Sequence, residues 1–401
     1  MMCVDVNGIG GCAMVRGRLA ERRKAVGLSQ EGLAESLGVD RSTIVRWERG
    51  TARPQPWLRP RLASALHVSI RELADLLDDT ADAAASAEAA RQSTAPAWDG
   101  SGVQTMHRFR HADPRLGGEF LYDDVLAYLR LAVAPRLFDV ADGDTAPLFA
   151  AAAGLTEMAG WMAYDSGLTV LAGRHFHRAF EFARTSGNRD LGAHILASLS
   201  HLAHHDRQPT EGIRYAERGL NLLRGEPADA GVDARLHAML ARGHAAHRDA
   251  AQCDASIDTA QRLLQQPLRA TTSPWPSMFD RGSLAIEKAR CYQQLGRLSR
   301  ARAATASAIA ARAPDRIRSR AFAQLTAVST MIEEGSLDEA CAMAGEVVDV
   351  TRTLGSQLVL RQLEGLLPRL APYADNRDVA AFLDRLRGRL SQRHRPPERS
   401  S

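Results

Sequence analysis

The sequence has few of the residues that build small disulfide-bonded or metal-stabilised proteins. Its five cysteines are scattered along the chain without a C-x-x-C pair, at Cys3, Cys12, Cys253, Cys291 and Cys341. This pattern argues against a disulfide or zinc framework and is typical of a reducing cytoplasm. We therefore expect neither a metal nor a cofactor, and we expect Cys253, Cys291 and Cys341 to be small apolar core residues.

Long hydrophobic runs and aromatic residues are also scarce. No stretch of about 18 apolar residues occurs, so no transmembrane span is predicted, and the first residues lack the basic and apolar regions of a signal peptide. Aromatic residues make up 5% of the 401 residues, whereas Ala, Leu and Arg are abundant, which favours an all-α fold. A chain of this length should form at least two structural units.

Signatures of catalysis are missing as well. The sequence contains no H-E-x-x-H zinc motif, no G-x-S-x-G nucleophile motif and no phosphate-binding loop with its lysine. We therefore predict that the protein is not an enzyme.

Positive charge is concentrated in one short segment. The whole chain carries a net charge of +4, but residues 14–77 contain 12 Lys and Arg against 7 Asp and Glu, a net charge of +5. A basic excess confined to one small unit predicts a polyanionic partner more strongly than the total charge does.

The segment LSQEGLAESLGVDRSTIVRWERG, residues 28–50, has the spacing of a helix-turn-helix. Ser29 is a suitable N-cap for a first helix, and Gly38 can end that helix because glycine readily takes a positive φ. The small Ala34 lets two helices cross closely, and Ile44 anchors the second helix in the core. We expect five short helices over residues 14–77.

This segment resembles the lambda-repressor-like, or XRE, helix-turn-helix family, in which the second helix of the motif lies in the major groove. The resemblance implies a set of DNA-contacting residues: Gln30, Arg41, Ser42, Thr43, Arg46, Arg49 and Arg53. Arg41, Ser42 and Arg46 are expected at base edges. Gln30 is expected to clamp a phosphate and brace the base-contacting helix, and Arg49 and Arg53 are expected at the backbone. The alternative is that these arginines form only a solvated helix face.

The larger part of the chain is an internal repeat. Small or apolar residues recur at offsets of 7, 5, 4 and 3 residues in five copies, which start 40, 41, 48 and 39 residues apart. Small side chains fall where the two helices of a hairpin must approach each other. The copies are Gly160, Gly167, Ala172, Phe176 and Ala179; Ser200, Arg207, Gly212, Ala216 and Gly219; Ala241, Arg248, Cys253, Ile257 and Ala260; Ala289, Gly296, Ala301, Thr305 and Ala308; and Val328, Gly335, Ala340, Ala344 and Val347.

These copies resemble the tetratricopeptide repeat, whose period of about 34 residues is shorter. The resemblance implies hairpins that stack into a curved α-solenoid with a concave side, because one hairpin cannot bury its apolar face alone. A generic helical bundle is the alternative. The predicted organisation is a disordered extension over 1–13, a DNA-binding domain over 14–77, a linker over 78–118, a repeat domain over 119–392 and a disordered tail over 393–401. This order of parts resembles actinobacterial XRE regulators and, more distantly, the peptide-sensing regulators of Gram-positive bacteria.

The first helix of each hairpin lines the concave side of such a solenoid, so its polar residues are candidate ligand contacts. Projection of the repeat register gives Glu157, Trp161, Tyr164, Asp165, His194, His201, His204, Arg235, Arg242, Arg290, Gln293 and Gln294. A ligand carboxylate would find donors among the His, Arg and Gln side chains, and an amine would find a carboxylate. The alternative is that these residues are merely solvated.

Two subsets of these groove residues have more specific expectations. Arg242 and Arg290 occupy the same register in neighbouring repeats, and we expect them to lack a carboxylate partner in the local sequence and to hold an anion between them. The alternative is that Glu333, Glu157 or solvent screens them. His201 with His204 or His205 has the spacing of two metal ligands, but no third ligand is nearby in the sequence, so no metal is predicted.

Together these features predict a transcriptional regulator that acts in the cytoplasm and is nucleoid-associated when bound to DNA. We expect a homodimer on double-stranded DNA with two half-sites, because one small domain makes few contacts. The repeat domain is expected to dimerise and to sense a peptide, a small molecule or a protein partner, without membrane association. The alternative is an interaction or antitoxin-like scaffold whose groove holds a partner polypeptide.

Overall fold

The computed structural model describes residues 17–48, 52, 54, 58–68, 70–77, 102–116, 118–138, 145–225, 227–266, 273–313, 316–351 and 354–394. Every regular element within these ranges is a helix, which confirms the all-α prediction. The chain divides into two compact units, Met1–Thr94 (unit 1) and Ala95–Ser401 (unit 2).

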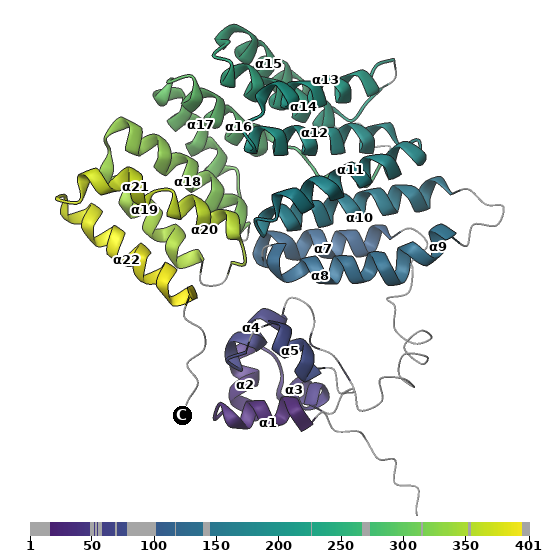
Figure 1. Ribbon diagram of the computed structural model, residues 1–401, viewed down its shortest axis with the longest axis vertical. Helices are drawn as coiled ribbons and strands as arrows, with labels where there is room; N and C mark the ends of the chain where they lie inside the picture. Colours follow the sequence, from purple (N-terminus) through teal and green to yellow (C-terminus); the bar gives the residue numbers. More distant parts are fainter. Residues whose placement is uncertain are drawn as a thin grey trace, which may run out of the picture. The chain divides into compact units, whose positions relative to one another are not determined.

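Unit 1 contains short helices packed around one small core (Figure 1). Its helices are α1 (Gly17–Ala25), α2 (Gln30–Leu37), α3 (Arg41–Glu48), α4 (Arg59–Ala65) and α5 (Ile70–Leu77). Each contributes a buried leucine or isoleucine to the core, namely Leu19, Leu33, Ile44, Leu62 and Leu73. Because the helices have at most nine residues, burial of these side chains rather than helix propensity holds the unit together.

Local sequence explains the turn between α2 and α3. The Ser29 side chain accepts a hydrogen bond from the Gly32 backbone N–H at 2.9 Å, as predicted for the N-cap. Gly38 ends α2 with φ 67°, a conformation that a side chain would strain. Asp40 Oδ1 then accepts a hydrogen bond from the Ser42 N–H at 2.7 Å and starts α3. These caps set the direction in which α3 leaves the turn.

Unit 2 is a longer series of helices. It begins with α7 (Val103–Leu116), α8 (Gly118–Tyr128), the π-helical turn η2 (Leu129–Val133) and α9 (Ala134–Phe138). Helical hairpins follow, formed by α10 (Ala146–Asp165) with α11 (Thr169–Thr185), α12 (Arg189–His205) with α13 (Pro209–Leu222), α14 (Ala230–Ala246) with α15 (Ala250–Leu263), α16 (Arg281–Gln294) with α17 (Leu298–Ala310), and α18 (Ile317–Glu334) with α19 (Leu337–Val350). The last elements are α20 (Gln357–Glu364), α21 (Leu367–Leu370), the 3-10 turn η3 (Ala371–Tyr373) and α22 (Arg377–His394).

The repeat copies coincide with these hairpins. The second position of every copy lies in the turn between the two helices and has a positive φ: 79° at Gly167, 58° at Arg207, 60° at Arg248, 73° at Gly296 and 81° at Gly335. The first and third positions are buried where the helices cross. At Gly160 an added Cβ would lie 2.5 Å from the Phe176 ring, so the crossing requires glycine.

Two predicted boundaries differ from the structure. The linker prediction for residues 78–118 placed no helix there, but α7 lies within it because Met106 packs into the core of unit 2. The tail prediction began at residue 393, whereas α22 continues to His394.

The hairpins of unit 2 curve so far that the last ones contact the first. Figure 1 shows an arc that runs from α7 and α8 through α12 and α14 and back to α18 and α20. Contacts between α18 and α7 and between α20 and α10 close this arc. The concave side is therefore bounded by both ends of the series.

Candidate functional sites

The outward face of α3 carries the predicted base-contacting residues. Arg41, Ser42 and Arg46 are exposed, whereas Ile44 on the opposite face is buried. The Thr43 hydroxyl accepts a hydrogen bond from Arg46 Nη2 at 3.1 Å, which orients the guanidinium along the helix. A short exposed basic helix that follows a tight turn has the geometry of a major-groove helix.

Gln30 connects this face to a buried ion pair that sequence reasoning missed. Its Nε2 donates to Glu48 Oε2 at 2.7 Å, and its Oε1 accepts from Arg41 Nη2 at 3.3 Å. Glu48 is paired with Arg23 of α1, with 2.6 Å between Oε1 and Nε, and both side chains are buried. Arg41 also forms an exposed ion pair with Glu31. This chain of contacts ties α3 to α1 and α2 and is compatible with a bracing role for Gln30.

Arg49 and Arg53 lie outside the described residues. Their contacts with the DNA backbone stay predictions.

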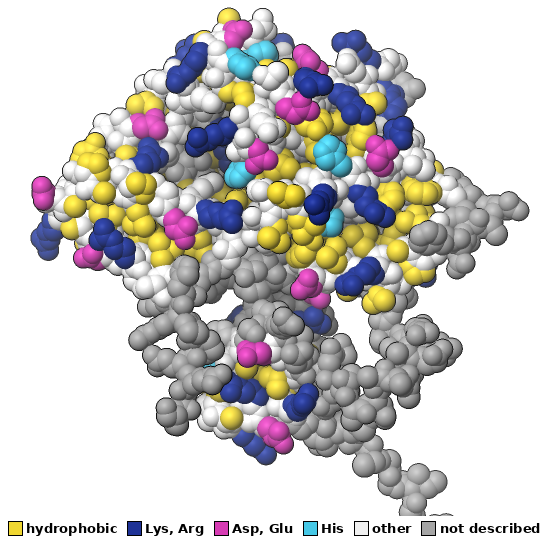
Figure 2. Space-filling model, viewed as in Figure 1, with side chains coloured by type: hydrophobic (Ala, Val, Ile, Leu, Met, Phe, Trp, Pro, Cys, Tyr) yellow, Lys and Arg dark blue, Asp and Glu magenta, His cyan; other side chains and the backbone are white. Residues whose placement is uncertain are grey.

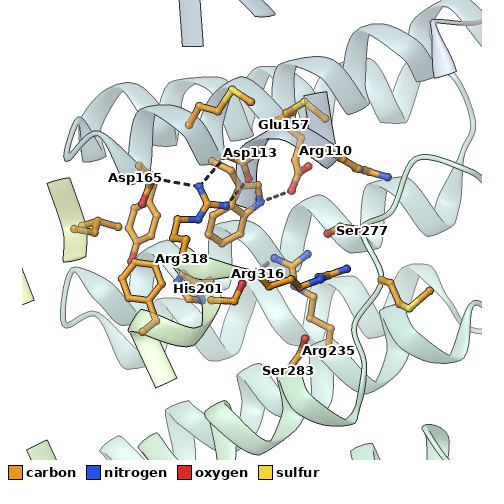
Figure 3. Close-up of a pocket in the computed structure, with 18 of the residues that line it drawn as sticks. Arg110, Asp113, Glu157, Asp165, His201, Arg235, Ser277, Ser283, Arg316 and Arg318 are labelled. Atoms are coloured by element: carbon orange, nitrogen blue, oxygen red, sulfur yellow. Dashed lines mark hydrogen bonds and ion pairs between the residues drawn. The ribbon is translucent and has the colours of Figure 1, made fainter. Parts of the chain in front are cut away.

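Unit 2 contains a cavity of about 600 Å³ on its concave side (Figure 3). The predicted groove residues that line it are Glu157, Trp161, Tyr164, Asp165, His201, Arg235 and Arg290. Met158, Met162, Phe322 and Leu358 add apolar surface. A volume of this size is in the range of small-molecule binding sites.

One wall of the cavity is formed by residues 273–279, here called the strap, which lie between α15 and α16. Trp275 at its centre is buried against α10, where its ring fills the space beside Gly154. Arg110 of α7 donates hydrogen bonds to the backbone carbonyl oxygens of the Pro-Trp-Pro sequence at 274–276. The long loop that gives one repeat its period of 48 residues therefore narrows the concave side.

The opposite side of the cavity carries an ionic bridge centred on Arg318, at the start of α18 (Figure 3). Arg318 forms ion pairs with Asp113 of α7 and, at 3.0 Å, with Asp165 of α10. Asp165 also accepts a hydrogen bond from Ser356 Oγ at 2.6 Å, and Ser356 is the N-cap of α20. Burial lowers the pKa of Arg318, but the two carboxylates raise it by more, so the guanidinium stays charged. This Arg318 bridge joins the two ends of the helical series.

Glu157 is the centre of a buried network behind the cavity wall. Its Oε1 accepts hydrogen bonds from Trp161 Nε1 at 2.5 Å and Ser198 Oγ at 2.8 Å, and Arg235 donates to Ser198 and to the His194 ring at 3.0 Å. Burial raises the pKa of Glu157, but His194, Arg235 and Ser198 lower it by more, to about 2. Burial, and then Arg235, lower the pKa of His194 to about 4. At neutral pH the glutamate is therefore charged and the histidine is neutral.

Ser277 completes a Ser–His–Glu set that lacks the geometry of a catalytic triad. Ser277 Oγ lies 3.3 Å from His194 Nε2, and Glu157 Oε1 lies 3.5 Å from the same nitrogen. In a triad the nucleophile and the carboxylate face opposite nitrogens of the imidazole ring. This arrangement does not support activation of Ser277 as a nucleophile.

Arg242 and Arg290 have a carboxylate partner, so the prediction that they lack one was wrong. Glu287, one helical turn before Arg290, lies 2.9 Å from Arg290 and 3.5 Å from Arg242. Burial raises the pKa of Glu287, but the two arginines lower it by more. The signal was in the sequence, because a Glu three residues before an Arg on a helix commonly pairs with it. No anion is needed to hold these two arginines together.

The remaining predicted groove residues lie apart from the main cavity. His194 is fully buried behind its wall. His204, Arg242 and Gln294 line a second cavity of about 340 Å³, and Gln293 lines a third of about 300 Å³. The His204 ring forms a hydrogen bond with the backbone carbonyl oxygen of Met239 in α14. The His201 ring packs edge-to-face against the Trp161 ring. Among the described residues, no three His, Cys, Asp or Glu side chains are placed to hold a metal ion.

Several cavity residues were missed from the sequence. His107, Arg110 and Asp113 were assigned to a linker, although they lie on α7 and line the cavity. Arg312, Arg316 and Arg318 come from the segment RAPDRIRSR, whose density of arginine was a usable signal. Figure 2 shows that basic, acidic and apolar side chains are interspersed over the face of unit 2 that it presents.

Comparison with known proteins identifies the first unit. A helix-turn-helix family model, HTH_3, matches residues 19–73. A protein of Methanothermobacter thermautotrophicus (strain Delta H), named an uncharacterised HTH-type transcriptional regulator, is 46% identical over 52 residues. That match covers 13% of this chain and 75% of the relative. No helix in the described part of the chain is long and apolar enough to cross a membrane.

Among solved structures, the chain is similar to PlcR of Bacillus thuringiensis, whose crystal structure contains the peptide PapR7 and DNA. The similarity covers 81% of this chain and 99% of that chain, with 13% sequence identity and a TM-score of 0.31. Similarity at this level is too low to carry an inference about either unit.

Proposed function

This chain belongs to the helix-turn-helix transcriptional regulators, and on that premise we propose that it binds operator DNA through α3 under the control of unit 2. The observation that carries the proposal is the exposed basic face of α3 within the matched domain. Arg41 pairs with the exposed Glu31, and an exposed ion pair of this kind can be exchanged for a base or a phosphate.

Base recognition is assigned to Arg41, Ser42 and Arg46. The variant Arg46→Ala should relax operator preference at one base pair in each half-site, because a bidentate Arg–guanine contact discriminates by about 1–3 kcal/mol. The measurement is selection of bound sequences from a random DNA pool. Arg18→Ala, an exposed arginine of α1, is the matched control and should keep the preference. If Arg46→Ala selects the same operator sequences as the wild type, Arg46 does not recognise a base.

Backbone contact is assigned to Arg49 and Arg53. Arg49→Ala and Arg53→Ala should each weaken binding to operator and random DNA alike and should lower the salt slope by about one, because each variant leaves one phosphate without its arginine. Weaker binding to the operator alone, with random DNA unaffected, would assign these residues to base recognition.

Operator binding is proposed to require two copies of the chain. A single domain of this size buries too little surface for high specificity, whereas a dimer can bind half-sites about 34 Å apart. Light scattering of the free protein, and titration with DNA that contains one or two half-sites, measure this directly. A monomer that binds one half-site as tightly as two would contradict it.

Unit 2 is proposed to sense an effector in its cavity rather than to hold a partner polypeptide. The strap and the Arg318 bridge bound the cavity on two sides, and its volume of about 600 Å³ suits a small molecule better than an extended polypeptide. On this proposal the protein acts by binding and not by catalysis. It acts in the cytoplasm, and on the nucleoid when bound to DNA. Operator binding is measured with and without the low-molecular-weight fraction of a cell extract. If the extract fraction does not change the affinity for operator DNA, the proposed control of DNA binding by a small-molecule effector is ruled out.

A further inference from the structure

The main cavity of unit 2 carries more positive than negative charge. The charged residues of its described lining are Arg110, Arg235, Arg290, Arg312, Arg316, Arg318, Asp113, Glu157 and Asp165. Arg318 forms ion pairs with both Asp113 and Asp165. Two carboxylates outside the lining also form ion pairs with lining arginines: Glu287 with Arg290, and Asp280 with Arg312. Glu157 is then the one carboxylate of this set left for Arg110, Arg235 and Arg316. The six arginines of the described lining thus outnumber its three carboxylates by three, and Glu287 and Asp280 reduce this excess of positive charge to one.

Arg235 is the most constrained of these three arginines. Its guanidinium is buried, lies 5.5 Å from the centre of the Trp161 ring, and donates hydrogen bonds to the neutral groups of His194 and Ser198. Burial lowers the pKa of Arg235, whereas the nearby Glu157 and Glu287 raise it. Because its hydrogen-bond partners are neutral, this buried cation can form a charge-assisted hydrogen bond with an incoming anion.

Arg316 and Arg110 differ in the interactions that their side chains already make. Arg316 is exposed and lines the cavity, and Asp280, whose pKa it helps to lower, forms its ion pair with Arg312 instead. Arg110 is occupied by the backbone carbonyl oxygens of the strap. Arg235 from α14 and Arg316 at the N-cap of α18 therefore present the available charge (Figure 3).

We propose that this cavity binds a compact organic anion, in which a carboxylate or phosphate is joined to a flat apolar body. Arg235 and Arg316 bind the anionic group, and Trp161, Met158 and Phe322 pack against the apolar body. The ligand must be compact because the strap and the Arg318 bridge bound the cavity on two sides. As an effector this ligand rests on the proposed function, but its binding can be measured without DNA.

The test uses the full chain and pairs of probes in which an anion is matched with a neutral compound that has the same aromatic body. The pairs are benzoate and benzamide, phenyl phosphate and phenol, and indole-3-acetate and indole-3-acetamide. Isothermal titration calorimetry gives the affinity, and the rise in unfolding temperature with probe concentration gives an independent value. At least one anion should bind about tenfold or more tightly than its neutral partner. A preference for the phosphate over the carboxylates, or the reverse, identifies the anionic group.

Variants locate the site. Arg316→Gln should reduce the affinity for the anion about tenfold, because one charge-assisted hydrogen bond is removed, and should leave the neutral probe unchanged. Arg302→Gln is the control, because Arg302 is an exposed arginine of α17 that pairs with Glu334 and Glu339 outside the cavity. Arg316 is preferred to Arg235 because loss of Arg235 would also remove a cation from the buried Glu157.

The proposal is overturned if no anionic probe binds more tightly than its neutral partner, or if Arg316→Gln and wild type bind the anion equally. Binding that depends on Arg316 but leaves operator affinity unchanged would keep the site and reject its regulatory role. An extract that alters operator affinity equally in wild type and in Arg316→Gln would keep regulation and reject this site.

Discussion

Arg41 of unit 1 and Arg318 of unit 2 form ion pairs of opposite kinds. On α3, Arg41 pairs with Glu31 and Gln30, its side chain is 60% exposed, and its partners lie within 11 residues of it. In unit 2, Arg318 is 18% exposed, and its partners Asp113 and Asp165 lie 205 and 153 residues away. An exposed ion pair contributes little to stability and can be exchanged, whereas loss of one partner from a buried pair is costly. The first arrangement suits reversible binding, and the second fixes a shape.

The largest expected difference between the two units is in how their stability depends on pH. Burial lowers the pKa of His194 and His204 to about 4 each, and it lowers the pKa of His201 well below its ordinary value. The unfolded chain, with a histidine pKa near 6.5, therefore binds protons first as the pH falls. The stability that these neutral histidines provide above pH 6.5 is lost toward pH 4, at up to about 1.4 kcal/mol per pH unit for each.

Urea unfolding of the full chain at a series of pH values from 7.5 to 4.5 measures this loss. Residues 1–94 contain a single histidine, the exposed His67, so unit 1 should be much less sensitive over the same range. Replacement of one of these histidines, the half-buried His204, by glutamine should flatten the pH dependence of unit 2. A dependence of equal size in the variant would contradict the assignment.

The next largest effect is expected at the bridge between the ends of unit 2. Arg318→Ala leaves Asp113 and Asp165 without their cation and should lower the free energy of unfolding by about 3–5 kcal/mol. Arg302→Ala also removes an arginine with two carboxylate partners, but its side chain is 39% exposed, so the loss of stability should be much smaller than for Arg318→Ala. Chemical denaturation of both variants compares them directly. Equal costs would show that burial does not separate the two kinds of pair.

A smaller effect is expected from adding one methyl group at a helix crossing. Gly160→Ala places a Cβ 2.5 Å from the Phe176 ring and should cost about 1–3 kcal/mol through overpacking. Gly388→Ala in α22 meets no atom within 4 Å, so it should instead stabilise by about 0.5–1 kcal/mol through helix propensity. Thermal unfolding gives both values, and the same sign for the two variants would contradict the account of the repeat.

The smallest effect is expected at the helix-turn-helix of unit 1. Ser29→Ala removes the cap of α2 and should lower the stability of this unit by about 1 kcal/mol. Ser36→Ala, at an exposed site inside the same helix, should be neutral or slightly stabilising because alanine is the better helix former. A thermal melt of unit 1 that is insensitive to Ser29→Ala would indicate that tertiary packing alone fixes the turn.

The fold was predictable where its causes are local. Ser29, Gly38 and the turn between the two helices of each repeat are set by residues within a few positions of one another, and the sequence pattern placed them. The helix α7 was missed because its segment has little apolar periodicity of its own. Met106 is buried in a core that α7 shares with α8 and α10, so its burial depends on tertiary packing.

The candidate sites divide in the same way. The exposed face of α3 follows from one motif, so its residues could be named in advance. The cavity depends on closure of the helical series, which brings together α7, α10, α18 and the strap. Repeat register alone therefore identified Glu157, Trp161 and Arg235 but could not include Arg110 or Arg318. It also placed Arg242 with the ligand contacts, because register does not show that Glu287 already pairs with it.

The Arg318 bridge also bears on how this protein can change during evolution. In an open solenoid a repeat can be inserted or deleted because each hairpin contacts only its neighbours. Here one additional hairpin would carry α18 away from Asp113 and Asp165 and break the connection between the ends. The number of hairpins is thus constrained by closure, as strand number is in a β-barrel. Divergence in this unit is left to substitution and to loop insertions such as the strap, and duplication of repeats is disfavoured.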